Sequence, residues 1–218
     1  MPLRYRRQVV QVGPHRIRLR TLMDRQQFSD PLGAAAAAGI SPASWPIFGV
    51  LWPAGRILAN LMTTEPIDNR HILEVGCGIG LASLVLQARG ADVTATDQHP
   101  EAEAFLRHNA ARNQPGEIHF VRAEWGGSDP GESALHEFDL IIGSDLLYEA
   151  PQAKLLAEFI GRHAAAACDV VIVDPRRGNT SRFVSRMGDH GFLNTEDTVH
   201  ALDEPEPFRG RVLRFTRG

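Results

Sequence analysis

The segment at residues 71–97 constrains the fold of this chain more than any other segment. An apolar run, ILEV, leads into a glycine-rich turn, GCGIG, then an apolar stretch of helical length and a second apolar run, VTATD. Strand, turn, helix and strand in this order form a unit with two parallel strands. Glycines at positions 76, 78 and 80 allow a ligand to approach the backbone of the turn. The segment therefore predicts a ligand site where the first strand ends.

The alternation continues along the chain and predicts the fold class. We expect strands at 71–75, 92–96, 118–122, 138–143 and 169–173, helices at 81–89, 100–113, 151–166 and 179–190, and an earlier helix opening at Pro53. Such alternation predicts a parallel sheet covered by helices on both faces. Two final strands, 192–200 and 209–216, lack an intervening helix and predict an antiparallel edge hairpin. The prediction is an α/β fold with a doubly wound, mostly parallel, seven-stranded sheet.

The N-terminal part of the chain predicts an extension of this domain. Residues 8–23 resemble two short strands around Gly13-Pro14, which predicts a β-hairpin. Residues 24–45 hold an Asp-Pro pair and an alanine run, and we expect a connector that could act as a lid. We therefore divide the chain into a hairpin with its connector, 1–45, and a single globular unit, 46–218.

Composition excludes several function classes. The chain has 218 residues, 43% of them hydrophobic, with a formal net charge of −3 and a pI of about 6.3, which disfavours nucleic-acid binding. Cys77 and Cys168 are the only cysteines, and they fit neither a disulfide framework nor a zinc site. We therefore expect no bound metal. We also expect a cytoplasmic protein, because neither a signal peptide nor a membrane-spanning stretch is visible.

The spacing of the glycines distinguishes two ligand classes. A dinucleotide loop has the pattern G-x-G-x-x-G, and here its third position would be Leu81, which fits poorly. The observed pattern, Glu74-x-Gly76-x-Gly78-x-Gly80, resembles the first motif of class I S-adenosylmethionine (SAM) methyltransferases. Asp97 ends the second strand, where a carboxylate can accept hydrogen bonds from ribose hydroxyls. Its alternative role is to cap the helix that follows.

Four further pieces narrow the resemblance. They are LWPAGRILA at 51–59, AEWG at 123–126, FDLIIGSDLLYE at 138–149, and the order in which these pieces occur. Together they resemble the seven-β-strand protein lysine methyltransferases that carry an Asp-x-x-Tyr motif. The resemblance covers roughly residues 45–150 and implies a Rossmann-like methyltransferase fold, SAM as the cofactor and a lysine-bearing protein as the substrate.

The resemblance also implies the roles of individual residues. Asp145 and Tyr148 would be the catalytic pair, which we expect to face one pocket from a single helical turn. The predicted cofactor-binding residues are Trp52, Glu74, Gly76, Cys77, Gly78, Gly80, Asp97, Gln98, Trp125 and Ser144. Trp52 would line the methionine end, Asp97 would hold the ribose and Trp125 would flank the adenine. Glu74 has a second interpretation, a contact with loop amides, and Asp174 is either a substrate contact or the start of a turn.

Two other functions remain open at this point. A small-molecule N- or O-methyltransferase would use the same sheet and the same cofactor loop. A non-catalytic protein that binds SAM or a partner would keep the fold without the transfer. The stretch Ser144-Asp145-Leu146-Leu147 lacks the Asn-Pro-Pro-Tyr type of motif that grips an extruded base, which disfavours nucleic-acid methylation.

Overall fold

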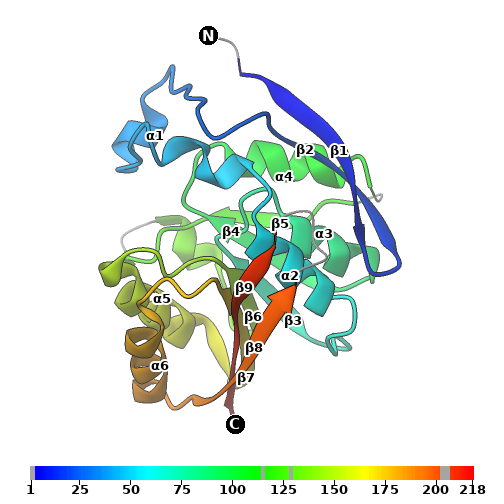
Figure 1. Ribbon diagram of the computed structural model, residues 1–218. Coiled ribbons are helices and arrows are strands. Elements are labelled where there is room, and N and C mark those ends of the chain that lie inside the picture. The colour runs from blue at the N-terminus through cyan, green and yellow to red at the C-terminus, as the bar shows by residue number, and fades with distance from the viewer. Residues whose placement is uncertain (1–2, 114–115, 128–129, 202–206) are drawn as a thin grey trace.

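The computed structural model describes residues 3–113, 116–127, 130–201 and 207–218, and a seven-stranded sheet lies at its centre (Figure 1). The strand order is β5-β4-β3-β6-β7-β9-β8. The strands are β3 (His71–Val75), β4 (Asp92–Asp97), β5 (His119–Arg122), β6 (Phe138–Ser144), β7 (Ala164–Asp174), β8 (Leu193–Ala201) and β9 (Phe208–Arg217). Strand β9 pairs antiparallel with β7 and β8, and the other pairs are parallel. The predicted sheet and its C-terminal hairpin are confirmed.

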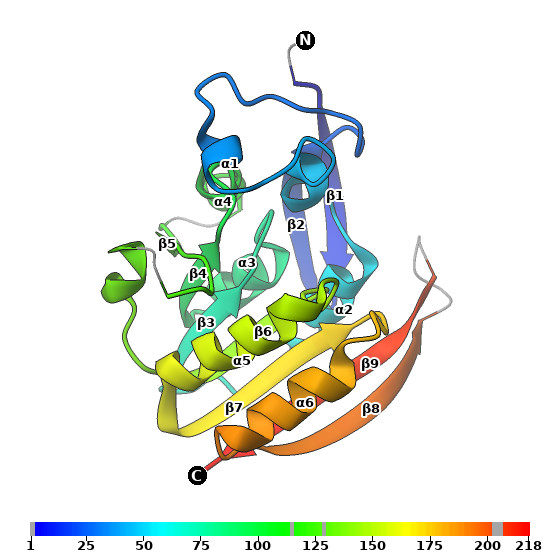
Figure 2. The ribbon, with the colours of Figure 1, turned by 90° about the vertical axis from the view of Figure 1, so that its left-hand side faces the viewer.

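Helices cover both faces of the sheet (Figure 2). They are α2 (Pro53–Leu61), α3 (Leu81–Ala88) and α4 (Ala102–Ala110) on one side, and α5 (Ala150–His163) and α6 (Thr180–Asp189) on the other. Consecutive strand residues point to opposite faces, so Ile72 joins the core beneath the first set and Leu73 the core beneath the second. Burial on both faces explains why the central strands β3, β6 and β7 are mostly apolar rather than alternating, whereas the edge strand β8 is polar and exposed.

The order of the strands fixes where a ligand can bind. The chain runs outward from β3 through β4 to β5, and then returns to the other side of β3 to form β6 and β7. The direction of winding therefore reverses between β3 and β6, which are hydrogen-bonded neighbours. In doubly wound sheets the crevice outside the carboxyl ends of the strands at such a reversal holds the ligand.

The predicted N-terminal hairpin is confirmed, as β1 (Tyr5–Val12) and β2 (His15–Leu22) in a separate two-stranded sheet. Asn109, fully buried on α4, joins the hairpin to the rest of the molecule. Its side-chain oxygen accepts a hydrogen bond from the Arg20 amide at 2.7 Å, and its side-chain nitrogen donates to the Ile79 carbonyl at 3.1 Å. The hairpin is thereby connected to the glycine loop through one amide group.

The connector after the hairpin contains a short helix, α1 (Ala34–Ala37), and a 3-10 helix, η1 (Trp45–Gly49). The rings of Phe48 and His99 stack with their centroids 3.8 Å apart. Since His99 follows β4, this stacking places the end of the connector at the carboxyl edge of the sheet. Burial lowers the pKa of His99 to about 4, so its ring is neutral at physiological pH.

One helix boundary was predicted wrongly. The expected helix at 151–166 ends at His163, and β7 begins at Ala164 instead of at residue 169. Alanine has the highest helix propensity, which favoured a longer helix. Ala164 instead pairs with Phe138 of β6, and the Arg217 side chain donates hydrogen bonds to the carbonyls of Ala164 and Ala165 at 2.7 and 2.8 Å. Tertiary pairing thus overrides the local preference of the alanine run.

Within the described residues, no helix combines the length and the apolar character needed to cross a membrane.

Candidate active site

The glycine loop after β3 has backbone angles that favour glycine. Gly76 and Gly78 have φ of +62° and +53°, and Gly80 precedes α3 with φ of +76°. A methyl group added at Gly78 would lie 2.7 Å from the carbonyl oxygen of Phe48, and one at Gly76 would lie 2.6 Å from Leu146. The loop therefore needs glycine both for its conformation and for its close neighbours.

Asp97 at the end of β4 is held against this loop. One carboxylate oxygen accepts a hydrogen bond from the Gly78 amide and the other accepts one from the His99 amide, both at 2.8 Å. Burial raises the pKa of Asp97, while these amide hydrogen bonds act in the opposite direction. Each oxygen has a second lone pair, so the carboxylate can still accept hydrogen bonds from a ligand.

Glu74 is buried within β3, behind the loop. One of its oxygens accepts hydrogen bonds from the Ser83 amide, at 2.8 Å, and from the Ser83 hydroxyl. Burial raises the pKa of Glu74 to about 7. The carboxyl group therefore fastens the first turn of α3 to the strand, through a helix amide rather than through the loop amides expected, and a contact with the cofactor stays a prediction. Cys77 is also buried, and burial raises the pKa of its thiol.

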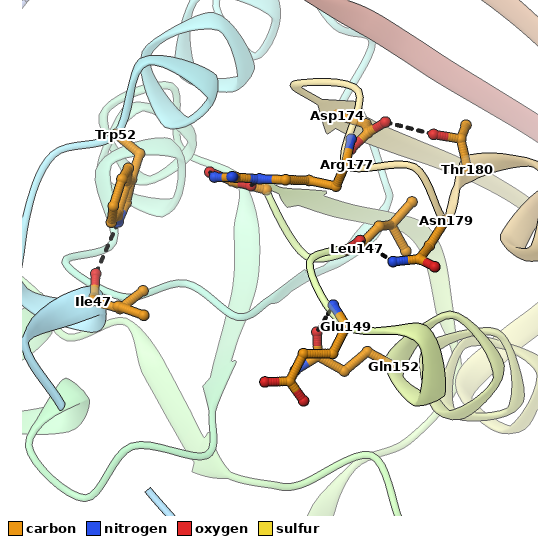
Figure 3. Close-up of polar contacts among 10 residues, drawn as sticks. Ile47, Trp52, Leu147, Glu149, Gln152, Asp174, Arg177, Asn179 and Thr180 are labelled. Carbon is orange, nitrogen blue, oxygen red and sulfur yellow. Dashed lines mark hydrogen bonds and ion pairs between the residues drawn. The ribbon is translucent and has the colours of Figure 1, made fainter. Parts of the chain in front are cut away.

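The other predicted cofactor residues differ in how close they lie to this loop. The ring of Trp125 reaches within 3.9 Å of the position that a methyl group on Gly76 would occupy. The Ser144 hydroxyl lies 3.6 Å from the corresponding position on Gly55 of α2. Trp52 donates an indole hydrogen bond of 2.8 Å to the Ile47 carbonyl, as Figure 3 shows, and the Arg25 guanidinium lies 4.2 Å from the centroid of its ring. Gln98 is exposed.

The predicted catalytic pair follows β6 directly, but not in the expected helical turn. Helix α5 begins only at Ala150, and Asp145 has a φ of +56°, a left-handed conformation that is uncommon for a residue other than glycine. Tyr148 is 42% exposed, and burial of the rest of its side chain raises its pKa, with nearby carboxylates contributing in the same direction. The pair follows β6 at the carboxyl edge of the sheet, and the local structure is a bend rather than a helix.

Sequence reasoning missed Arg177, which forms a two-point ion pair with Asp145. Its Nε donates to Oδ1 at 2.7 Å and its Nη2 donates to Oδ2 at 2.8 Å. Asp174, the other ambiguous residue, is fully buried and accepts a hydrogen bond of 2.6 Å from the Thr180 hydroxyl. It therefore supports the start of α6, as expected for a turn residue. The segment DPRRG after β7 was the available signal for Arg177, but the spacing alone does not pair it with Asp145.

These residues fit SAM. The backbone at Gly76 and Gly78 is bare, Asp97 presents a carboxylate beside it, and Trp125 supplies an aromatic surface next to Gly76. The fold is that of the class I SAM-dependent methyltransferases. Within that class the chain belongs to the lysine methyltransferase family, because residues 44–190 match the model of that family. Among the described residues, no group of three His, Cys, Asp or Glu side chains could hold a metal ion.

Known proteins from two branches of the class are similar to this chain. Protein N-lysine methyltransferase METTL21A of Xenopus tropicalis is 32% identical over 157 residues, which cover 67% of this chain and 66% of the relative. Magnesium-protoporphyrin O-methyltransferase of Rhodobacter capsulatus is 29% identical over 162 residues, which cover 71% and 70%. The matches to METTL21A and to an Arabidopsis thaliana calmodulin-lysine N-methyltransferase span only 66% and 52% of those proteins.

A solved structure confirms the fold. Magnesium protoporphyrin IX methyltransferase from Synechocystis PCC 6803, with bound SAM, has a TM-score of 0.58 and 18% sequence identity. The superposition covers 74% of this chain and 76% of that one. At this identity the similarity establishes the shared fold and nothing further.

Proposed function

We propose that this chain transfers a methyl group from SAM to the side chain of a lysine in a protein. The observation that carries the proposal is the position of Asp145, a carboxylate on the loop after β6, directly beside the glycine loop after β3. Leu146, the next residue, packs so closely against Gly76 that a methyl group there would lie 2.6 Å from it. Membership of the lysine methyltransferase family supports the choice of acceptor.

The cofactor would lie across the loop formed by Gly76, Cys77, Gly78 and Gly80. Asp97 would accept hydrogen bonds from its ribose, with Gln98 beside it. The remaining predicted contacts would come from Trp52, Trp125, Ser144 and Glu74. When bound, SAM supplies a methyl group on a sulfonium centre, which is already activated for displacement.

The acceptor amine must be neutral when its nitrogen attacks the methyl group. The pKa of an ordinary lysine is about 10.4, so deprotonation near pH 7 costs about 4 to 5 kcal/mol. Asp145 and Tyr148 would orient the amine by accepting or exchanging hydrogen bonds with it. The acceptor first releases its proton to solvent. The bond from nitrogen to carbon then forms as the bond from sulfur to carbon breaks, which leaves a methylated ammonium ion and S-adenosylhomocysteine. Alignment and the exclusion of water supply most of the rate.

The experiment is incubation of the purified protein with SAM labelled in its methyl group and a lysate from a knockout strain of the source organism. We expect a labelled protein band whose label is recovered in methylated lysine after hydrolysis. Asp145→Ala should abolish the label, and a matched change on α5, Glu158→Ala, should retain it. Label that appears only in the fraction of small molecules would contradict the proposed acceptor.

The second candidate function is that of a small-molecule O-methyltransferase. It is favoured by the match to the protoporphyrin enzyme, which covers slightly more of both sequences than the match to METTL21A does. The same experiment separates the two, because the products partition into different fractions. Binding of SAM without a methylated product in either fraction would instead indicate a non-catalytic protein.

We place the activity in the cytoplasm, with a protein as the partner.

A further inference from the structure

The ion pair between Arg177 and Asp145 is the feature of the site that the proposed reaction does not use. Both carboxylate oxygens of Asp145 accept a hydrogen bond from the guanidinium, and the Asp145 side chain is only 12% exposed. Each oxygen keeps one lone pair. Asp145 can therefore still accept a hydrogen bond from an incoming amine, but its negative charge already has a partner.

Besides the ion pair, two hydrogen bonds fix the loop after β6 to β7 and its following loop, and Figure 3 shows the one between Asn179 and Leu147. The Asp145 amide donates to the Val173 carbonyl at 2.8 Å, and the Asn179 side chain donates to the Leu147 carbonyl at 2.9 Å. The Arg177 amide donates to a carboxylate oxygen of the buried Asp174 at 3.3 Å. These hydrogen bonds indicate that the ion pair between Arg177 and Asp145 is preformed and that the Arg177 side chain does not move away.

Backbone strain points in the same direction. Asp145 and Arg176 both have positive φ, of +56° and +64°, on the two loops that meet here. Such conformations cost free energy in residues other than glycine and persist where the surrounding structure determines them. The left-handed backbone of Asp145, which accepts both hydrogen bonds of the guanidinium, is therefore held by the structure around it.

The charges around the ion pair determine whether a bound lysine is stabilised as an ammonium ion or as a neutral amine. Asp145, Tyr148 and Glu149 come from the loop after β6, and Asp97 comes from β4. Asp174, Arg176 and Arg177 come from β7 and the loop that follows it. A lone carboxylate stabilises the ammonium form of a bound lysine and so opposes the deprotonation that transfer requires. A guanidinium paired with that carboxylate removes most of this effect.

We propose that Arg177 is a positioning residue for the methyl acceptor, which stays paired with Asp145 during turnover and cancels its charge. Asp145 then accepts a hydrogen bond from a neutral amine instead of holding an ammonium ion. This inference rests on the proposed lysine acceptor, since only an amine has to lose a proton before transfer.

Binding of n-butylamine, a mimic of the lysine side chain, tests the proposal without turnover. The complex with S-adenosylhomocysteine is titrated with the amine at several pH values and followed by NMR, in the wild type, Arg177→Gln, Arg177→Lys and the neighbouring control Arg176→Gln. We expect wild-type affinity to rise with pH as the amine loses its proton. Arg177→Gln should bind the ammonium form several-fold more tightly near pH 7, whereas Arg177→Lys and Arg176→Gln should behave like the wild type.

The rate of labelling of the lysate proteins provides the second measurement. In Arg177→Gln the rise of the labelling rate with pH should occur at a pH about one unit higher, because the acceptor keeps its proton up to a higher pH. Arg177→Lys should restore the wild-type pH dependence, with intact mass excluding methylation of the new lysine. An unshifted pH dependence with an equal loss at every pH, or unchanged butylamine binding, would overturn the proposal. So would faster turnover of Arg177→Gln at every pH, which would make Arg177 a gate.

The two proposals can fail separately. If no protein becomes labelled, the proposed function fails, and butylamine binding still reports on the pair. If proteins become labelled but Arg177→Gln binds butylamine like the wild type, only the role of Arg177 fails. Thermal melts of each variant confirm that the compared proteins are folded.

Discussion

The amide of Gly78 donates a hydrogen bond of 2.8 Å to one carboxylate oxygen of Asp97, and this bond ties the glycine loop after β3 to the end of β4. The cofactor loop and the carboxylate predicted to hold the ribose therefore form one unit. A change in either residue should disturb both the loop and the cofactor.

Asp97→Ala should weaken SAM binding strongly. It removes the acceptor for the ribose and the acceptor for two backbone amides, and hydrogen bonds to charged groups contribute about 1.5 to 3 kcal/mol each. We expect a rise in Kd of at least tenfold, measured by calorimetric titration. Asp92→Ala, at the exposed start of the same strand, is the matched control and should leave Kd unchanged. Equal affinities for the two variants would remove Asp97 from the cofactor site.

Gly78→Ala tests the need for a bare backbone in the loop. The matched control is Gly90→Ala, which also has positive φ, at +80°, but has no atom within 4 Å of the added methyl group. Gly90→Ala should cost about 1 to 2 kcal/mol from backbone strain alone. Gly78→Ala should cost more, because its methyl group meets the Phe48 carbonyl, and it should also lose SAM binding. Urea unfolding and SAM titration measure the two effects.

Glu74 should make stability depend on pH. Burial raises its pKa from an ordinary 4.5 to about 7, so the folded protein binds this proton more tightly than the unfolded chain does. Its contribution is fully present below about pH 4.5 and is lost as the pH rises through about 7, by up to about 3 kcal/mol. His99 acts in the opposite sense over an overlapping range, since its pKa is lowered to about 4.

The measurement for Glu74 is therefore a difference between variants. The free energy of unfolding by urea is determined from about pH 4 to about pH 8 for the wild type, Glu74→Gln and the exposed control Glu137→Gln. Glu74→Gln should gain stability relative to the wild type as the pH rises across this range, and Glu137→Gln should follow the wild type. A constant difference for Glu74→Gln would show that its carboxyl does not titrate on folding.

Substitutions in the predicted catalytic pair should lower methyl transfer without weakening cofactor binding. Asp145→Ala is expected to lower turnover by at least a hundredfold while the Kd for SAM changes less than threefold, because we propose that the residue contacts the acceptor and not the cofactor. Tyr148→Phe removes only a hydroxyl and should lower turnover about tenfold. A parallel loss of SAM affinity in Asp145→Ala would move Asp145 into the cofactor shell.

The sheet was predictable because its signal is local. Strand β3 has the predicted bounds, 71–75, since a mostly apolar run followed by glycines permits few alternatives. The same locality caused the error at Ala164, where helix propensity favoured a helix but pairing with Phe138 of β6 produced a strand. Local patterns do not contain contacts made across the sheet.

The site was predictable only in part for the same physical reason. The glycines, Asp97 and Asp145 follow strands whose carboxyl ends meet at one edge, so their proximity follows from topology. The pairing of Arg177 with Asp145 depends on two left-handed residues and on loop contacts 32 positions apart, which no local pattern encodes. Likewise, Ser83 as the partner of Glu74 emerges only when α3 folds back on β3.

A crystal structure of the protein with SAM tests the central claim most directly. The account predicts SAM at the carboxyl ends of β3 and β4, with its ribose hydroxyls on the Asp97 carboxylate, its adenine beside Trp125 and its methyl group directed toward Asp145. The absence of SAM from this position at saturating SAM, or a nicotinamide dinucleotide bound there in its place, would contradict the account.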